Sequence, residues 1–180
     1  VEGDLTRYLE YPVLAGLFQW LMAGLSRLTY PLIELTPLII PAASWYFALT
    51  ALAMSGMWVF AIRLVADLAG NRVWDTVLVA ASPLVVVHAF TNWDIPSIMF
   101  VVGALHAVSR GRPGLAGVLI GLGTAFKLWP LYVLGAFLVL AVRDRRPAPF
   151  LAMLLTSAVT WLAVNLPVMV MYPAAWNEFL

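Results

Sequence analysis

Two ionisable residues stand where apolar runs of the sequence end, and their types suit chemistry on a phosphate-linked substrate. Asp94 lies in the segment Thr91–Pro96, just before one apolar run, and Lys127, the only lysine in the chain, separates two others. A carboxylate can accept the proton of an acceptor hydroxyl group, and a compact ammonium group can bind phosphate. Because ionisable side chains are costly at membrane depth, each one is a candidate for function.

Both residues also have a structural interpretation. Asp94 or Asn92 could cap the next helix, with Pro96 in its first turn. Lys127 could extend its aliphatic stem to the membrane interface. His88 adjoins the same turn as Asp94. The polar residues that we expect to gather on one face are Glu10, His88, Asn92, Asp94 and Lys127.

The composition determines the kind of scaffold that must position these residues. Hydrophobic residues make up 63% of the chain and charged residues 11%, whereas soluble domains have about 45–50% and about 25%. With a mean hydropathy of +0.95, the chain needs lipid as its solvent, so its backbone must be paired internally. The apolar runs are continuous rather than alternating, which favours helices over a barrel.

The same composition excludes several other classes of function. The net charge of +1 argues against nucleic-acid binding, and the absence of cysteine excludes disulfides and thiolate metal sites. Two histidines without cysteine argue against a transition-metal site. The sequence contains no phosphate-binding loop, dinucleotide fingerprint, HExxH motif or nucleophile elbow. We therefore expect neither a metal nor a cofactor.

The apolar runs predict an all-α, polytopic membrane helix bundle with about six crossings. They cover residues 41–65, 73–90, 95–108, 114–126, 128–142 and 149–172. The third, fourth and fifth runs are shorter than the roughly 20 residues of a typical span. Either flanking residues complete these helices, or the helices do not cross fully and surround an aqueous cavity. Pro83 and Pro167 lie inside apolar runs and are expected to kink them.

Arginine placement orients the predicted bundle. The breaks at residues 63–72, 110–112 and 143–146 contain arginine, and they alternate with breaks that contain none. By the positive-inside rule, the arginine breaks are cytoplasmic. The turn at residues 88–94 and Lys127 are then extracytoplasmic, and the protein is a multi-pass protein of the plasma membrane.

This orientation divides the chain into three parts. Residues 1–40 form an extracytoplasmic loop with an amphipathic helix, residues 41–173 form the helix bundle, and residues 174–180 begin a second extracytoplasmic loop. The segment 11–30 is long enough to span, but its Gln, Ser and Arg favour a helix lying on the outer surface. A true span there would raise the number of crossings to seven. The prolines at 31, 37 and 41 are expected to end the helix and to break the chain beyond residue 30.

Small residues within one run predict close helix packing. Gly117, Gly121 and Ala125 recur every four residues, so they share one face of a helix. The arginine-rich break at 143–146 is interpreted first as an orientation signal, and second as a contact for anionic lipid.

Four segments together resemble a known family. They are Glu10–Leu14 (EYPVL), His88–Pro96, Gly121–Pro130 and Tyr172–Trp176. The first resembles the tyrosine–proline motif after the first outer loop in the GT-C superfamily of membrane glycosyltransferases. Within that superfamily, the chain resembles glycosyltransferase family 87, the polyprenol-phosphate-mannose-dependent mannosyltransferases.

The resemblance implies sugar transfer on the extracytoplasmic face of the membrane. The sugar, with mannose expected, would pass from a polyprenyl-phosphate donor to a lipid or glycan acceptor, and membrane lipids would surround the enzyme. Asp94 is then the candidate catalytic residue, and the candidate substrate-binding residues are Lys127, His88, Asn92, Glu10 and Tyr11. The sequence departs from the family pattern at its start, because the first membrane helix and the general base after it are expected upstream of Val1.

Two other functions remain open from the sequence. A transporter or flippase of lipid-linked sugars would have paired, interrupted helices in two related halves, and the chain shows no such internal symmetry. A non-catalytic membrane subunit would use the same polar residues only for capping and for interfacial anchoring. An acidic residue just after a preceding membrane helix would favour the transferase.

Overall fold

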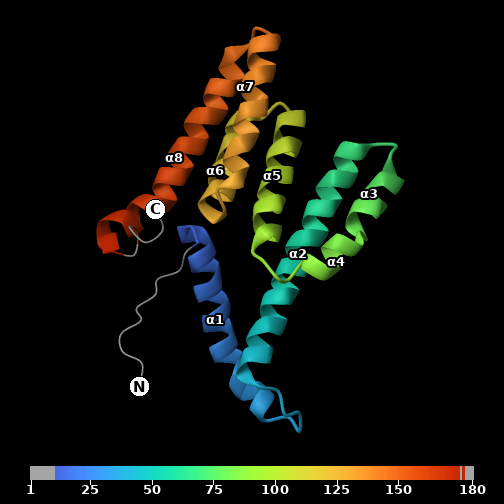
Figure 1. Cartoon of the computed structure of the whole chain (residues 1–180), viewed down its shortest axis with the longest axis vertical. Helices are drawn as coiled ribbons and strands as arrows, with labels where there is room; N and C mark the ends of the chain where they lie inside the picture. The colour runs from blue at the N-terminus through green and yellow to red at the C-terminus, as the bar shows by residue number, and fades with distance from the viewer. Residues whose placement is uncertain (1–10, 175, 177–180) are drawn as a thin grey trace.

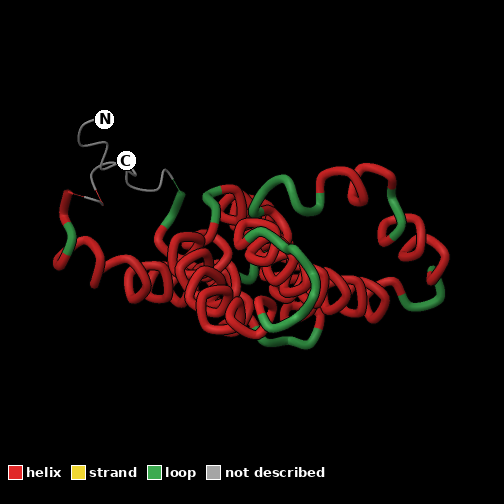
Figure 2. The backbone as a smooth tube through the Cα atoms, turned by 90° about the horizontal axis from the view of Figure 1, so that it is seen from below, coloured by secondary structure: helices red, strands yellow, loops and turns green. Residues whose placement is uncertain are grey.

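The computed structural model describes residues 11–174 and 176, and these residues form helices joined by short connections, with no strand among them (Figures 1 and 2). The all-α prediction is therefore confirmed for this part of the chain. In chain order the helices are α1 (Val13–Glu34), α2 (Ala42–Ala69), α3 (Val73–Ala80), α4 (Pro83–His88), α5 (Asp94–Ser109), α6 (Pro113–Phe126), the 3-10 helix η1 (Trp129–Tyr132), α7 (Val133–Arg143) and α8 (Pro147–Met171).

Two helices of the described residues, α2 and α8, are long and apolar enough to cross a membrane. They contain 28 and 25 residues, or about 42 and 38 Å at a rise of 1.5 Å per residue. The hydrocarbon core of a bilayer is about 30 Å thick. Helices α5 and α6 contain only 16 and 14 residues, or about 24 and 21 Å. The structure thus supports two candidate spans and does not confirm the six predicted crossings.

The apolar run at residues 73–90 forms two short helices instead of one bent helix. Helix α3 ends at Ala80, and Pro83 opens α4 as its first residue. Proline suits that position because its missing N–H would have no partner there. The expected kink at Pro83 is therefore a break. By contrast, α8 continues through Pro167.

Helix α1 pairs with the start of α2 as a hairpin (Figure 1). The indole Nε1 of Trp45 donates a hydrogen bond to Thr29 Oγ1 at 2.8 Å, and the Tyr30 hydroxyl donates one to the Ile40 carbonyl at 3.0 Å. The prediction that Pro31 ends the first helix is wrong, because α1 continues through it to Glu34. Proline removes one backbone hydrogen bond, and here it lies in the last turn of the helix.

The bundle packs most closely where α6 meets α8. A Cβ atom added to Gly117 would overlap the Thr156 hydroxyl and the Met153 carbonyl, and one added to Gly121 would lie 2.6 Å from the Ser157 carbonyl oxygen. These two glycines therefore let the backbones touch, which confirms the predicted small-residue face. Because the contacts advance together along both helices, α6 and α8 run parallel.

The connections that carry arginine gather at one end of the bundle. In Figure 1 the α2–α3, α5–α6 and α7–α8 connections all lie toward the top, and the start of α5 and the end of α6 lie below them. This separation agrees with the alternation of arginine along the sequence. The side of the membrane that each end faces stays a prediction.

Candidate functional site

Asp94 and Lys127 form an ion pair. Lys127 Nζ lies 2.5 Å from Asp94 Oδ1 and donates a hydrogen bond to it. The side chains of Lys127 and Asp94 are 27% and 43% exposed, respectively, so the pair is only partly accessible to solvent. The two residues are 33 positions apart in the chain, and their interaction joins the start of α5 to the end of α6.

The geometry of α5 and α6 explains why these two residues meet. The helices are connected by a tight turn and run antiparallel: Gly103 of α5 faces Leu119 of α6, and Phe100 faces Gly123. Because the helices have similar lengths of 16 and 14 residues, their far ends lie at the same level. Lys127 then leaves the helix with an extended backbone (φ −158°, ψ 142°).

The ion pair bears differently on the two structural interpretations of Asp94 and Lys127. Helix α5 begins at Asp94 with Trp93 at its N-cap, and no side chain caps it, so the capping role expected of Asp94 or Asn92 is wrong. The negative charge of Asp94 still lies in the first turn, where the helix dipole favours it. Lys127 is bound to a carboxylate, and its position relative to the membrane interface stays a prediction.

Tyr11 and Asn92 meet beside this pair. The Tyr11 hydroxyl donates a hydrogen bond to Asn92 Oδ1 at 3.4 Å, and the same oxygen accepts the Trp93 backbone N–H at 2.8 Å. The amide of Asn92 therefore connects the beginning of the α1 segment to the turn that carries Asp94. Both residues were predicted as substrate contacts, which stays a prediction; in the structure their hydrogen bond joins Tyr11 to this turn.

Three aromatic rings pack behind the polar residues. Phe18 of α1 makes an edge-to-face contact with Trp93, with ring centroids 5.9 Å apart, and a tilted contact with Phe126 at 5.8 Å. Such pairs are worth about 0.5–1.5 kcal/mol beyond the area that they bury. Because Trp93 precedes Asp94 and Phe126 precedes Lys127, one ring of α1 stabilises both sides of the ion pair. Sequence reasoning missed this cluster.

The remaining predicted residues are not brought to the pair. His88 ends α4 with an exposed side chain, and no hydrogen bond or ion pair to its imidazole occurs within the described residues. Its carbonyl accepts hydrogen bonds from Thr91, so it belongs to the turn through its backbone. Glu10 lies outside the residues that the structure describes.

A polar side chain in α8 was also missed. Asn165 is fully buried, its Nδ2 donates to the Trp161 carbonyl at 2.7 Å, and its Oδ1 has no partner among the described residues. A buried acceptor without a hydrogen bond is unusual and needs an explanation. The only signal in the sequence was an asparagine inside an apolar run.

An apolar cleft is lined by residues that follow Lys127 in the chain. It has a volume of about 410 Å³ between the η1–α7 segment and α8, and its lining includes Leu128, Leu131 and Trp161. Leu128 is the residue directly after Lys127 in the chain, but Lys127 itself does not line the cleft, and its ammonium group binds Asp94 of α5.

The chain was compared with known proteins in three ways. The model of glycosyltransferase family 87 matches residues 8–180. Neither a curated protein nor a solved structure matches the chain significantly.

Proposed function

Because the chain belongs to glycosyltransferase family 87, we propose that the full-length protein transfers mannose from a polyprenyl-phosphate donor to a lipid or glycan acceptor. Membrane association is supported by the two long apolar helices, α2 and α8. The reaction would take place on the extracytoplasmic face, at the end of the bundle opposite the arginine connections. No nucleotide would be needed, because the leaving group is a lipid phosphate.

The observation that carries the proposal is the pair of Asp94 and Lys127. In the proposed reaction an acceptor hydroxyl attacks the anomeric carbon, and the bond from that carbon to the phosphate oxygen breaks. The electron pair leaves with the polyprenyl phosphate, which gains a negative charge, and Lys127 stabilises that charge. The hydroxyl proton passes to a carboxylate, for which Asp94 is the candidate in this part of the chain.

The apolar cleft lined by Leu128, the residue after Lys127, supports a lipid-linked donor. With the phosphate at Lys127, the first prenyl units would extend along Leu128, Leu131 and Trp161 toward the bilayer. Burial of apolar surface stabilises such binding by about 25 cal/mol per Å², so the chain would add affinity without adding specificity for the sugar.

The neighbouring residues would bind and position the substrates. Asn92 has a side-chain amide that can contact a sugar hydroxyl, and Tyr11 holds that amide in place. His88, exposed at the same turn, and Glu10, at the start of the tyrosine–proline segment, are proposed as further contacts to the sugar or the acceptor.

The test is a transfer assay on the full-length protein in vesicles that contain polyprenyl-phosphate mannose and candidate acceptors. We expect labelled mannose to appear on the acceptor. Movement of intact donor across the bilayer without transfer would instead indicate a flippase, and neither activity would indicate a non-catalytic subunit.

Asp94→Asn tests the role of the carboxylate in the same assay. If Asp94 accepts the proton, turnover falls about 10²- to 10⁴-fold while the Michaelis constant for the donor changes little. If Asp94 only positions Lys127, the Michaelis constant for the donor rises and turnover is largely kept. The second result would assign the general base to another part of the full-length protein, as the family resemblance suggests.

A further inference from the structure

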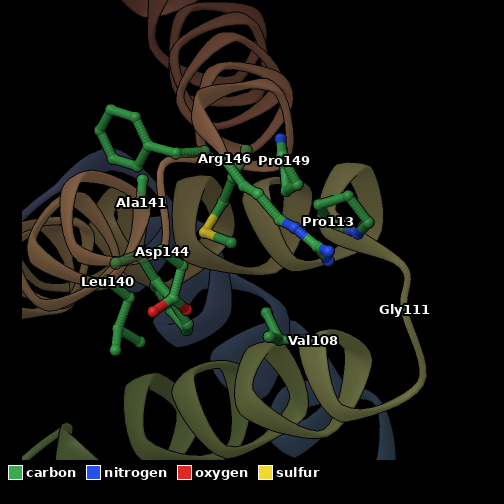
Figure 3. Close-up of a pocket in the computed structure, with 11 residues that line it drawn as sticks. Val108, Gly111, Pro113, Leu140, Ala141, Asp144, Arg146 and Pro149 are labelled. Atoms are coloured by element: carbon green, nitrogen blue, oxygen red, sulfur yellow. The ribbon is translucent and has the colours of Figure 1, made fainter.

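A second apolar cleft opens at the arginine end of the bundle, between the ends of α5 and α7 and the starts of α6 and α8 (Figure 3). Its volume is about 420 Å³, within the range of about 300–1,000 Å³ that small-molecule sites occupy. Phe137, Leu140, Phe150 and Met153 contribute to its apolar lining. Arg146 is one of the two charged residues that line it.

Arg146 is positioned to receive an anion. In Figure 3 its side chain reaches toward Pro113, whereas Asp144 lies nearer Leu140. Asp144 Oδ1 accepts a hydrogen bond from Arg143 Nε at 2.9 Å, so this carboxylate pairs with Arg143 and not with Arg146. Within the described residues, no carboxylate lies within ion-pair distance of the Arg146 guanidinium.

Most charged residues near Arg146 are positive as well. Residues 110–112 and 143–146 contain five arginines and one aspartate, Asp144. The two segments lie at the same end of the bundle, as Figure 1 shows for the α5–α6 and α7–α8 connections. A positive field therefore covers the end of an apolar cleft, which is complementary to a ligand with an anionic head and a hydrocarbon tail.

We propose that this cleft binds an anionic phospholipid. One acyl chain occupies the cleft between α7 and α8, and the headgroup phosphate accepts hydrogen bonds from Arg146. Arginine suits this contact because its planar fork can bind two phosphate oxygens at once. Basic pockets between membrane helices bind acidic headgroups elsewhere for the same reasons.

The site is separate from the one at Asp94 and Lys127. Helix α6 starts at the cleft and ends at Phe126, just before Lys127, and its 14 residues extend about 21 Å. A phosphate at Arg146 therefore cannot be the donor phosphate at Lys127. The inference does not depend on the proposed transfer reaction, and it assigns a different lipid to a different end of the helices.

The experiment measures lipid binding to the full-length protein. The protein is purified in detergent, freed of lipid, and titrated with dioleoyl phosphatidylglycerol or dioleoyl phosphatidylcholine, and bound lipid is counted by native mass spectrometry. We expect the anionic lipid to bind more tightly, and Arg146→Gln to weaken its binding about tenfold or more, the effect of losing a charge-assisted hydrogen bond. Arg146→Lys should retain part of the affinity.

Matched variants separate a site from general attraction to arginine. Arg72→Gln removes an arginine of the same end of the bundle, one that pairs with Asp75 at 3.0 Å outside the cleft, and it should leave the affinity unchanged. Ala141→Phe fills the cleft while Arg146 stays, and it should weaken binding of the intact lipid. Thermal unfolding of each variant, measured first, verifies that it is folded.

Three results would overturn the proposal. Equal affinity for the two lipids would remove the role of the headgroup charge. Equal effects of Arg146→Gln and Arg72→Gln would leave only a diffuse positive field. Competition by water-soluble glycerol phosphate at the same concentration as the intact lipid would show an anion site that does not use the apolar cleft.

Discussion

Under the proposed function, replacing Lys127 with methionine should weaken binding of the polyprenyl-phosphate donor about 10- to 150-fold. The substitution keeps a long apolar stem and removes the ammonium group, which in the structure is bound to Asp94, on a side chain that is only 27% exposed. A lost charge-assisted hydrogen bond is worth roughly 1.5–3 kcal/mol, and about 1.4 kcal/mol corresponds to a factor of ten in affinity. The measurement is the dependence of the transfer rate on donor concentration in the full-length enzyme.

The ion pair introduces a second effect that must be separated from the first. Without Lys127, the Asp94 carboxylate loses its partner, and for a pair that is neither fully exposed nor buried this costs about 1 kcal/mol or somewhat more in stability. The lone carboxylate would also repel the donor phosphate. A simple loss of affinity in Lys127→Met could therefore come from Asp94.

The double variant Asp94→Asn with Lys127→Met distinguishes the two causes. If the single variant suffers only from the unpaired carboxylate, the double variant should recover donor affinity. If Lys127 contacts the phosphate, the double variant should stay as weak as the single one. The phosphate role would be refuted if either variant bound the donor as tightly as the wild type at matched amounts of folded protein. The ion pair would then have only a structural role.

Three further predictions test the packing, the orientation and the buried amide. Gly121→Ala should destabilise the protein by about 1–3 kcal/mol, because the added Cβ would lie 2.6 Å from a carbonyl oxygen of α8. The control is Gly24→Ala, whose added Cβ has nothing within 4 Å; in thermal unfolding it should be neutral or stabilising by up to about 1 kcal/mol. Cysteines placed at the exposed residues Thr91 and Asn71 should react oppositely with an impermeant thiol reagent on intact cells, and labelling at Asn71 alone would invert the proposed orientation. Asn165→Leu removes an unpaired buried oxygen and should leave thermal stability unchanged or higher; if transfer activity falls while stability does not, Asn165 contacts a substrate.

The sequence predicted the helices well where apolar runs end at strong breaks. The runs at 95–108 and 114–126 correspond to α5 and α6, which are bounded by Asp94, by the turn at 110–112 and by Lys127. Prolines were harder to interpret. Pro83 opens a new helix, but α1 continues through Pro31, because the packing around each proline decides whether the lost hydrogen bond is tolerated.

The sequence predicted which residues lie at the candidate site, but not which of them contact one another. The alternation of the helices placed Asp94 and Lys127 at one end, yet their direct pairing depends on α5 and α6 having nearly equal lengths, which the apolar pattern alone does not determine. The cluster of Phe18 with Trp93 and Phe126 was missed for a similar reason. An aromatic residue in an apolar run looks the same whether it faces lipid or another ring.

The difference in length between the helices has a consequence for the surrounding bilayer. If α2 and α8 span a hydrocarbon core of about 30 Å, then α5 and α6, at about 24 and 21 Å, end short of one surface. Mismatch of this kind is relieved by local thinning of the bilayer or by water entering above the short helices, at a fraction of a kcal/mol per Å. If the shortfall lies at the end of Asp94 and Lys127, the thickness of the host membrane should affect the proposed transfer reaction: longer acyl chains would slow the meeting of donor and acceptor, and shorter chains would ease it.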